Sequence, residues 1–109
     1  MGGKWGYQQA MSTIATGRRH ELKCWPEFFE PLFDGLKTSE IRLNDRDFQV
    51  GDMIEFREWS PTINAEGYTG RQCTRLVTHV LQPWVGGGIE PGHVILSLWR
   101  VQVNGQDAL

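Results

Sequence analysis

The residues best suited to chemistry lie in one short stretch, DGLKTSEIRLNDRDFQVGD, at positions 34–52. Lys37 and Glu40 are three residues apart across a turn, so they can form an ion pair that keeps both groups charged. Arg42 offers a planar fork suited to a phosphate or a guanine edge. Glu40 can accept a hydrogen bond from the exocyclic amine of a base. Together these groups predict a polar cleft for a nucleotide or single-stranded RNA.

Neighbouring segments supply further candidates for binding a ligand. Lys23, Thr38 and Arg46 add polar contacts, and Trp25 and Trp59 lie where an indole could stack on a base. The pattern also has plainer interpretations. Charges of both signs suit the solvated, salt-bridged outer face of an edge strand, and tryptophans can plug the ends of a barrel. Pattern alone leaves these alternatives open.

Two other functions remain compatible with the same residues. If Lys37 were desolvated beside Arg42, its pKa would fall and it could act as a base or nucleophile, with Glu40 handling protons. Lys37 and Glu40 are therefore the candidate catalytic pair if the protein is an enzyme. A protein–protein interaction module is the third possibility, and it would depend on exposed aromatic side chains instead.

A metal site is not expected. The candidate ligands are two cysteines and three histidines without a C-x-x-C pair, namely His20, Cys24, Cys73, His79 and His93. A structural zinc site needs four close ligands, and these residues fall on separate predicted strands. We expect core cysteines and surface histidines, with no metal and no cofactor.

The elements that must position these residues can be read from periodicity. Alternating apolar and polar residues, or β-branched runs, predict five strands at 20–25, 39–44, 53–59, 71–82 and 94–103. Pro26 suits the first turn of a helix and Gly35 suits its end. Pro31 removes a backbone donor, so this helix should be short and kinked. The pattern predicts an α+β fold, a small curled or closed β-barrel of about five strands with an early short helix.

Length and charge bound the remaining possibilities. The 109 residues suit one domain at 18–103, with a flexible tail at 1–17 and a frayed C-terminus at 104–109. The net charge of −2 provides no global attraction for nucleic acid, so RNA binding would need a local basic cleft or the tail. Two cysteines and the lack of an apolar leader indicate a cytoplasmic protein with free thiols and no membrane partner. Either Met1 or Met11 could be the native start.

The stretch HELKCWPEFFEPLFDGLKTSEIRLNDRDFQVGD resembles the ASCH domain of the PUA-like superfamily, most closely a small bacterial and phage branch of unknown function. The motif G-x-K-x-x-E-x-R is matched by Gly35, Lys37, Glu40 and Arg42, and the resemblance covers about residues 20–102. It implies a small PUA-like β-barrel with an early helix. It also implies that the motif lines a cleft for RNA or a nucleotide.

One related group of bacterial enzymes hydrolyses the acetyl amide of acetylated cytidine. The resemblance implies that those enzymes use a lysine and a threonine of this motif with a later glutamate. Lys37 matches the lysine, but Glu40 stands at the threonine's position and Thr38 matches a different one. We therefore predict a monomeric RNA- or nucleotide-binding module, with a nucleoside-directed amidohydrolase of the N-acylcytidine type as the alternative.

Overall fold

The structure, a computed structural model, describes residues 16–103 and 106–107. The segment 1–15 of the predicted tail therefore lies outside the described residues. The elements in chain order are β1 (Arg19–Cys24), α2 (Pro26–Phe33), β2 (Ser39–Leu43), β3 (Met53–Trp59), β4 (Tyr68–Leu81), β5 (His93–Arg100), β6 (Gln102–Val103) and β7 (Gln106–Asp107).

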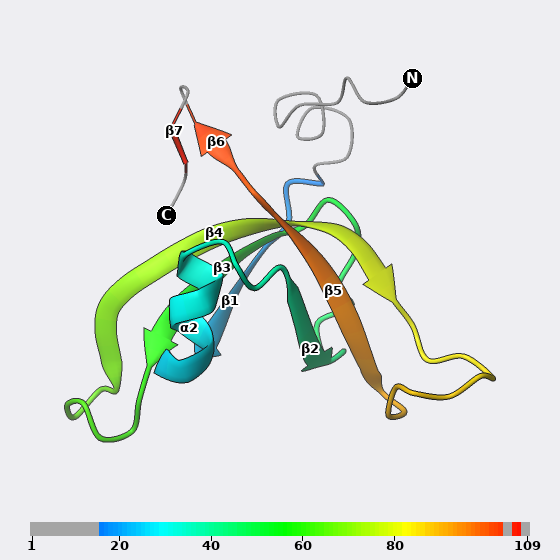
Figure 1. The fold of residues 1–109 in the computed structure, drawn as a ribbon, viewed down its shortest axis with the longest axis horizontal. Coiled ribbons are helices and arrows are strands. Elements are labelled where there is room, and N and C mark those ends of the chain that lie inside the picture. Colours follow the sequence, from blue (N-terminus) through cyan, green and yellow to red (C-terminus); the bar gives the residue numbers. More distant parts are fainter. Residues whose placement is uncertain (1–15, 104–105, 108–109) are drawn as a thin grey trace.

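Five strands form one mixed sheet in the order β1-β3-β4-β5-β2. The β1–β3 pair is parallel, and the other three pairs are antiparallel. The sheet curls into a half-barrel, and α2 lies beneath the arch of its long strands (Figure 1). The predicted α+β fold of about five strands with an early short helix is confirmed at this level.

The core fills the hollow of the half-barrel. Strand alternation was predicted correctly for β1 and β3, whose apolar faces are buried through Leu22 and Cys24 and through Ile54 and Phe56. Cys24 is a free thiol, as is Cys73 of β4. Period-two burial therefore places one face of each strand against the helix.

Helix α2 buries only part of its apolar face. Phe29 and Leu32 are fully buried, and Phe33 packs beside them, whereas Phe28 is half-exposed. The helix begins at Pro26 and continues through Pro31, with the chain leaving it at Gly35 in the left-handed region at φ +82°. A face spanning four aromatic and aliphatic residues is wider than an eight-residue helix can bury against one sheet.

Two arginines from distant strands cap the end of α2. The buried guanidinium of Arg75 donates to the carbonyl oxygens of Leu32 at 2.8 Å and Phe33 at 3.4 Å. Arg100 also donates to Phe33 at 3.1 Å. The last carbonyls of a helix have no partners within it, and the helix dipole favours positive charge there. These contacts fix the helix against β4 and β5, just before the motif begins.

Both ends of the domain differ from the prediction. Thr16 was assigned to the tail, but its hydroxyl donates to Asp52 at 2.7 Å and its amide donates to Gly51 at 3.0 Å. Strand β7 pairs with β6, although residues 104–109 were predicted to fray. In the described part of the chain, no helix has both the length and the apolar character to cross a membrane.

Candidate functional site

The two edge strands of the half-barrel are joined by arginine side chains. Nη2 of Arg42, on β2, donates to the main-chain oxygen of Lys23 on β1 at 2.7 Å. Farther along, Nη1 of Arg46 donates to the main-chain oxygen of Glu21 at 2.7 Å. Strands β1 and β2 are not neighbours in the sheet. They lie at its opposite edges, and the curl of the sheet brings them together.

Strand β2 turns its charged face inward. The side chains of Glu40 and Arg42 are 11% and 27% exposed. Ile41 and Leu43, on the other face, are 59% and 53% exposed as residues. Glu40 pairs with Leu96 and Arg42 with Val94, two buried positions of β5, so the polar side chains share the core side of the sheet. A freely solvated edge does not fit this arrangement.

Glu40 lies at the centre of an ion-pair network. Its Oε1 is 2.5 Å from Nζ of Lys37, and its Oε2 accepts from Nε of Arg42 at 2.7 Å. Lys37 also donates to the main-chain oxygen of Ser39. The predicted pairing of Lys37 with Glu40 is therefore confirmed. Both carboxylate oxygens are engaged by cations, which fixes the orientation of all three side chains.

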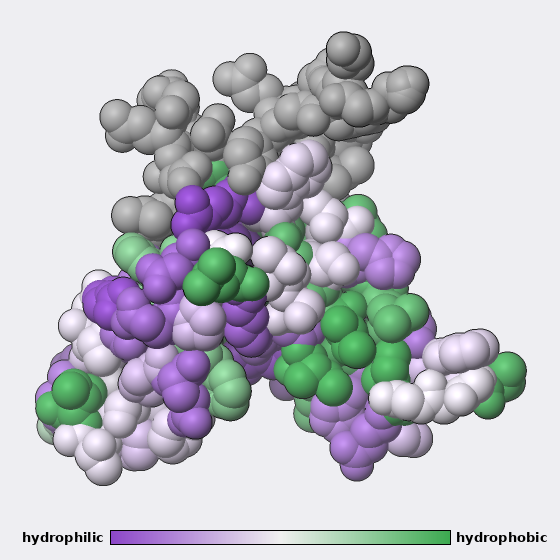
Figure 2. Space-filling model, viewed as in Figure 1, coloured by the Kyte–Doolittle hydropathy of each residue, from purple (hydrophilic) through white to green (hydrophobic). Residues whose placement is uncertain are grey.

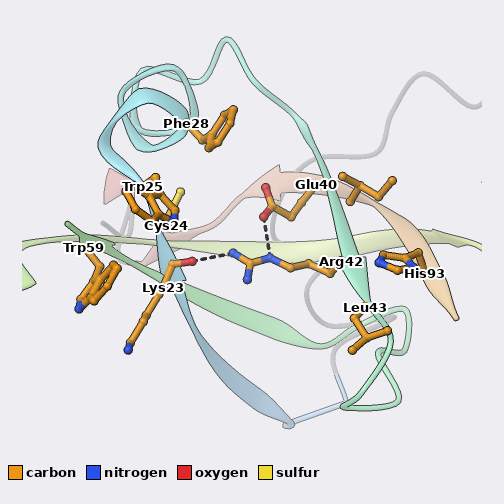
Figure 3. Close-up of a pocket in the computed structure, with 10 residues that line it drawn as sticks. Lys23, Cys24, Trp25, Phe28, Glu40, Arg42, Leu43, Trp59 and His93 are labelled. Atoms are coloured by element: carbon orange, nitrogen blue, oxygen red, sulfur yellow. Dashed lines mark hydrogen bonds and ion pairs between the residues drawn. The ribbon is translucent and has the colours of Figure 1, made fainter. Parts of the chain in front are cut away.

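A cavity of about 490 Å³ opens beside this network, between β1, β2 and the start of α2. Figure 3 shows Trp25, Phe28 and Trp59 around it, with Arg42 reaching toward Lys23 and Glu40 pointing to Arg42. The rings of Trp25 and Trp59 meet edge to face at 5.6 Å. Aromatic walls beside a fixed guanidinium suit a flat, polar heteroaromatic ligand.

Lys23 and Trp59 are held in place at the rim. Nζ of Lys23 lies 4.5 Å from the centre of the Trp59 ring. The indole N–H of Trp59 donates to the main-chain oxygen of Glu66 at 3.1 Å. A Cβ on Gly67 would come within 2.1 Å of the same indole, so only glycine allows this close approach. The hairpin between β3 and β4 therefore positions Trp59.

The predicted site residues do not all line one cavity. Five of them, Lys23, Trp25, Glu40, Arg42 and Trp59, line the aromatic cavity. Lys37 lines an adjoining cavity of about 400 Å³, and Arg46 lines a third. Thr38 is exposed and lines none of these three, while its main-chain oxygen accepts from Leu98 at 2.9 Å.

Sequence reasoning missed five lining residues. They are Cys24, Phe28, Ile41, Leu43 and His93. Phe28 matches the spacing of the apolar face of the helix but is half-exposed, and His93 lies opposite Leu43 in the β2–β5 register. The signal that could have found Phe28 is the excess width of that apolar face.

The chemistry open to Cys24 is limited. Burial raises the pKa of its thiol to about 11, with Glu40 adding to the increase. The thiol therefore stays protonated near neutral pH and is a poor nucleophile. Within residues 16–103 and 106–107, no three His, Cys, Asp or Glu side chains gather as a metal site would require.

Comparison with known proteins gives two matches. A family model described as "Domain of unknown function (DUF3850)" matches residues 19–98. The chain is also 31% identical over 68 residues to the "Uncharacterized 12.9 kDa protein in GpA 3'region" of Escherichia phage P2. That alignment covers 61% of this chain and 59% of the length of the phage protein. The matched family segment includes every element of the cleft.

Proposed function

Because this chain belongs to the DUF3850 family, whose function is unknown, we propose a function from its cleft: the protein is an RNA- or nucleotide-binding module. The ligand would occupy the aromatic cavity between β1 and β2. Its base would contact the tryptophans, and its polar edge would face Glu40 and Arg42.

The observation that carries this proposal is the hydrogen bonding of the Arg42 side chain. A guanidinium has five N–H groups. One donates to Glu40 and one to the main-chain oxygen of Lys23, which leaves three for a ligand. The two bonds also fix the plane of the group, so little conformational entropy would be lost on binding.

The aromatic rim supports the same proposal. Trp25 and Phe28 are 47% and 51% exposed, so aromatic surface beside the cavity is open to a ligand. Stacking on a base is tolerant of sequence because every base has a π face. Lys23 beside Trp59 supplies a cation for a phosphate at the same rim.

We further propose that the half-barrel is an ASCH domain of the PUA-like superfamily. In support, the three charged residues of the motif, Lys37, Glu40 and Arg42, form a single network. The motif glycine, Gly35, ends α2 with positive φ and lies against Arg100. Each motif position thus has a physical role in building the cleft.

Titration of short single-stranded RNAs and free nucleotides at several salt concentrations tests the proposal. We expect modest affinity whose logarithm falls with log salt at a slope of about −2 to −3, since few phosphates are contacted at ~0.7 each. Trp25→Ala should weaken binding by about 1–3 kcal/mol without changing that slope. Trp84→Ala, an exposed indole outside the cavity, is the matched control.

Two results would contradict the proposal. The first is no detectable binding of any RNA or nucleotide. The second is binding that is indifferent to simultaneous substitution of Lys37, Glu40 and Arg42. Circular dichroism of each variant is needed beside the titration, because these residues also join the sheet edges.

A protein–protein interaction module is the second candidate. Leu81, Ile95 and Ile41 lie directly opposite one another across β4, β5 and β2, so they share the outer face of the sheet. Figure 2 shows hydrophobic side chains gathered over this part of the molecule. Partner binding there should survive Trp25→Ala and should fail on Leu81→Ser, the reverse of the pattern expected for RNA.

A further inference from the structure

The third cavity, lined by Arg46, is more basic than the aromatic one and shares lining residues with it. It has a volume of about 290 Å³, and four of its lining residues are cations against a single acid, Glu21. The cations are Lys23, Arg42, Arg46 and Arg57. The whole chain carries a net charge of −2, so positive charge is concentrated here against the overall balance. Such a focus of charge attracts anions.

Arg57 was not identified from the sequence, and it is held in a fixed orientation. Its guanidinium lies over the ring of Tyr68 at 4.0 Å. It sits directly across from Lys23 in the parallel β1–β3 register. Stacking on an aromatic face leaves the edge of the guanidinium available for a planar anion. Two neighbouring strands therefore present a lysine and an arginine to one cavity.

The basic and aromatic cavities share two lining residues. Lys23 and Arg42 line both of them. A ligand with an aromatic part in one cavity and an anionic part in the other would contact these two residues at its middle. A nucleoside phosphate has that shape, with a flat base at one end and a phosphate at the other.

We infer that the basic cavity is a phosphate subsite, which makes the ligand a nucleoside phosphate and not a free base or nucleoside. This inference rests on the proposed function of the aromatic cavity. Arg57, Lys23 and Arg46 contact the phosphate, and Tyr68 holds Arg57 in position. The phosphate is either a terminal monoester or an internal diester of RNA, which share the same charged oxygens.

Substitution of Glu21 tests the inference because it should strengthen phosphate binding instead of weakening it. Its Oε1 lies 3.5 Å from Nη1 of Arg57, and its side chain is 65% exposed. It is the one carboxylate lining the cavity, so it competes with an incoming phosphate for Arg57. Glu21→Gln should therefore tighten phosphate binding, although the substitution adds no cation.

Calorimetry of the full chain provides the test. The probes are the four ribonucleosides, their 5′-monophosphates, their 5′-phosphate methyl esters and inorganic phosphate. We expect at least one monophosphate to bind about tenfold tighter than its nucleoside, as one or two charge-assisted hydrogen bonds would provide. Arg57→Gln should remove most of that difference, and Glu21→Gln should widen it. Arg71→Gln, a cation outside all three cavities, should leave it unchanged.

The outcomes distinguish failure of the phosphate subsite from failure of the proposed function of the aromatic cavity. A nucleoside that binds as tightly as its monophosphate overturns the phosphate subsite and leaves the aromatic cleft standing. Arg57-dependent binding of inorganic phosphate, with no binding of nucleosides or RNA, supports the subsite and overturns the proposed function. A methyl ester that binds as well as the monophosphate assigns an internal RNA phosphate. If Arg57→Gln fails to fold, the exposed Lys23→Gln makes the same test, and an unchanged phosphate advantage in both variants overturns the inference.

Discussion

The guanidinium of Arg42 donates a 2.7 Å hydrogen bond to the main-chain oxygen of Lys23. This contact joins the two edge strands of the open sheet, β1 and β2, through a side chain instead of a ladder of backbone hydrogen bonds. An unpaired strand edge exposes carbonyl groups that can recruit another chain. Arg42, together with Arg46 and Glu21, satisfies part of that edge within the molecule. Arg42 therefore both connects the two edges of the half-barrel and is a proposed contact for the ligand.

Substitution of Arg42 should therefore lower stability even without ligand. Arg42→Gln loses the bond to Lys23 and leaves Glu40 with one cation. We expect a decrease of about 1–3 kcal/mol in the free energy of unfolding by urea, since the group is mostly covered. Arg19→Gln, which removes an exposed pair with Glu55 at 3.8 Å, should change stability little. Equal effects of the two substitutions would show that the edge contact is not structural.

Arg75 should be the most sensitive polar residue of the domain. The residue is 3% exposed, and its guanidinium donates to the main-chain oxygens of Thr74, Leu32 and Phe33. Arg75→Met keeps the volume of the stem but removes the side-chain donor to the carbonyls of Leu32 and Thr74, at a cost of about 2–4 kcal/mol, while Phe33 keeps its bond from Arg100. Thermal unfolding beside the exposed Arg19→Met measures the difference. Similar melting temperatures would contradict the capping role.

Asp52 should make the protein sensitive to acid. Burial alone would raise the pKa of its carboxyl, but hydrogen bonds from His20, Thr16 and the amide of Gln49, with Arg18 nearby, hold that pKa below its ordinary value. A lowered native pKa favours the fold above the unfolded pKa of about 4, and this contribution is lost as pH falls through the native value.

Unfolding measured between neutral pH and pH of about 2 checks this expectation. Asp52→Asn should be less stable at neutral pH and should lose less stability on acidification. Thr16→Val, which removes one donor to the carboxylate, should lie between that variant and the wild type. An acid dependence identical in all three proteins would show that Asp52 titrates normally.

The parts of the fold that were predictable are those set by local pattern. The β3 strand was identified at residues 53–59 because Ile54 and Phe56 alternate with half-covered positions. Helix α2 was identified from Pro26 at its start and Gly35 just past its end. In these segments, the spacing of apolar residues along the sequence predicts both the type of secondary structure and the face that is buried.

The remaining features depend on contacts between distant residues. Alternation showed that Glu40 and Arg42 share one face of β2, but not that this face is the covered one. Coverage comes from the curl of the sheet, which brings β1 across the cleft, and from the parallel β1–β3 pair. Arg57 was missed because its partners, Tyr68 and Glu21, come from two other strands.

Acyl transfer chemistry is not expected from the cleft. The ammonium of Lys37 is held by Glu40 and by the main-chain oxygen of Ser39, and Thr38 is exposed outside the three cavities. Incubation with N-acylcytidine without added metal, followed by chromatography, should give little or no free cytidine. Robust turnover that disappears in Lys37→Ala would overturn the binding-module interpretation in favour of a hydrolase.

The indole N–H resonances of the tryptophans test the central claim most directly. In a ¹H–¹⁵N spectrum, addition of a nucleotide or short RNA should shift the signals of Trp25 and Trp59, which line the cavity. Trp99, which packs against Met53, Leu76 and Val101, should keep its position. Shifts of Trp25 and Trp59 that saturate with ligand would support a base in the cleft. No indole shift at saturating RNA, or a shift confined to Trp84, would contradict it.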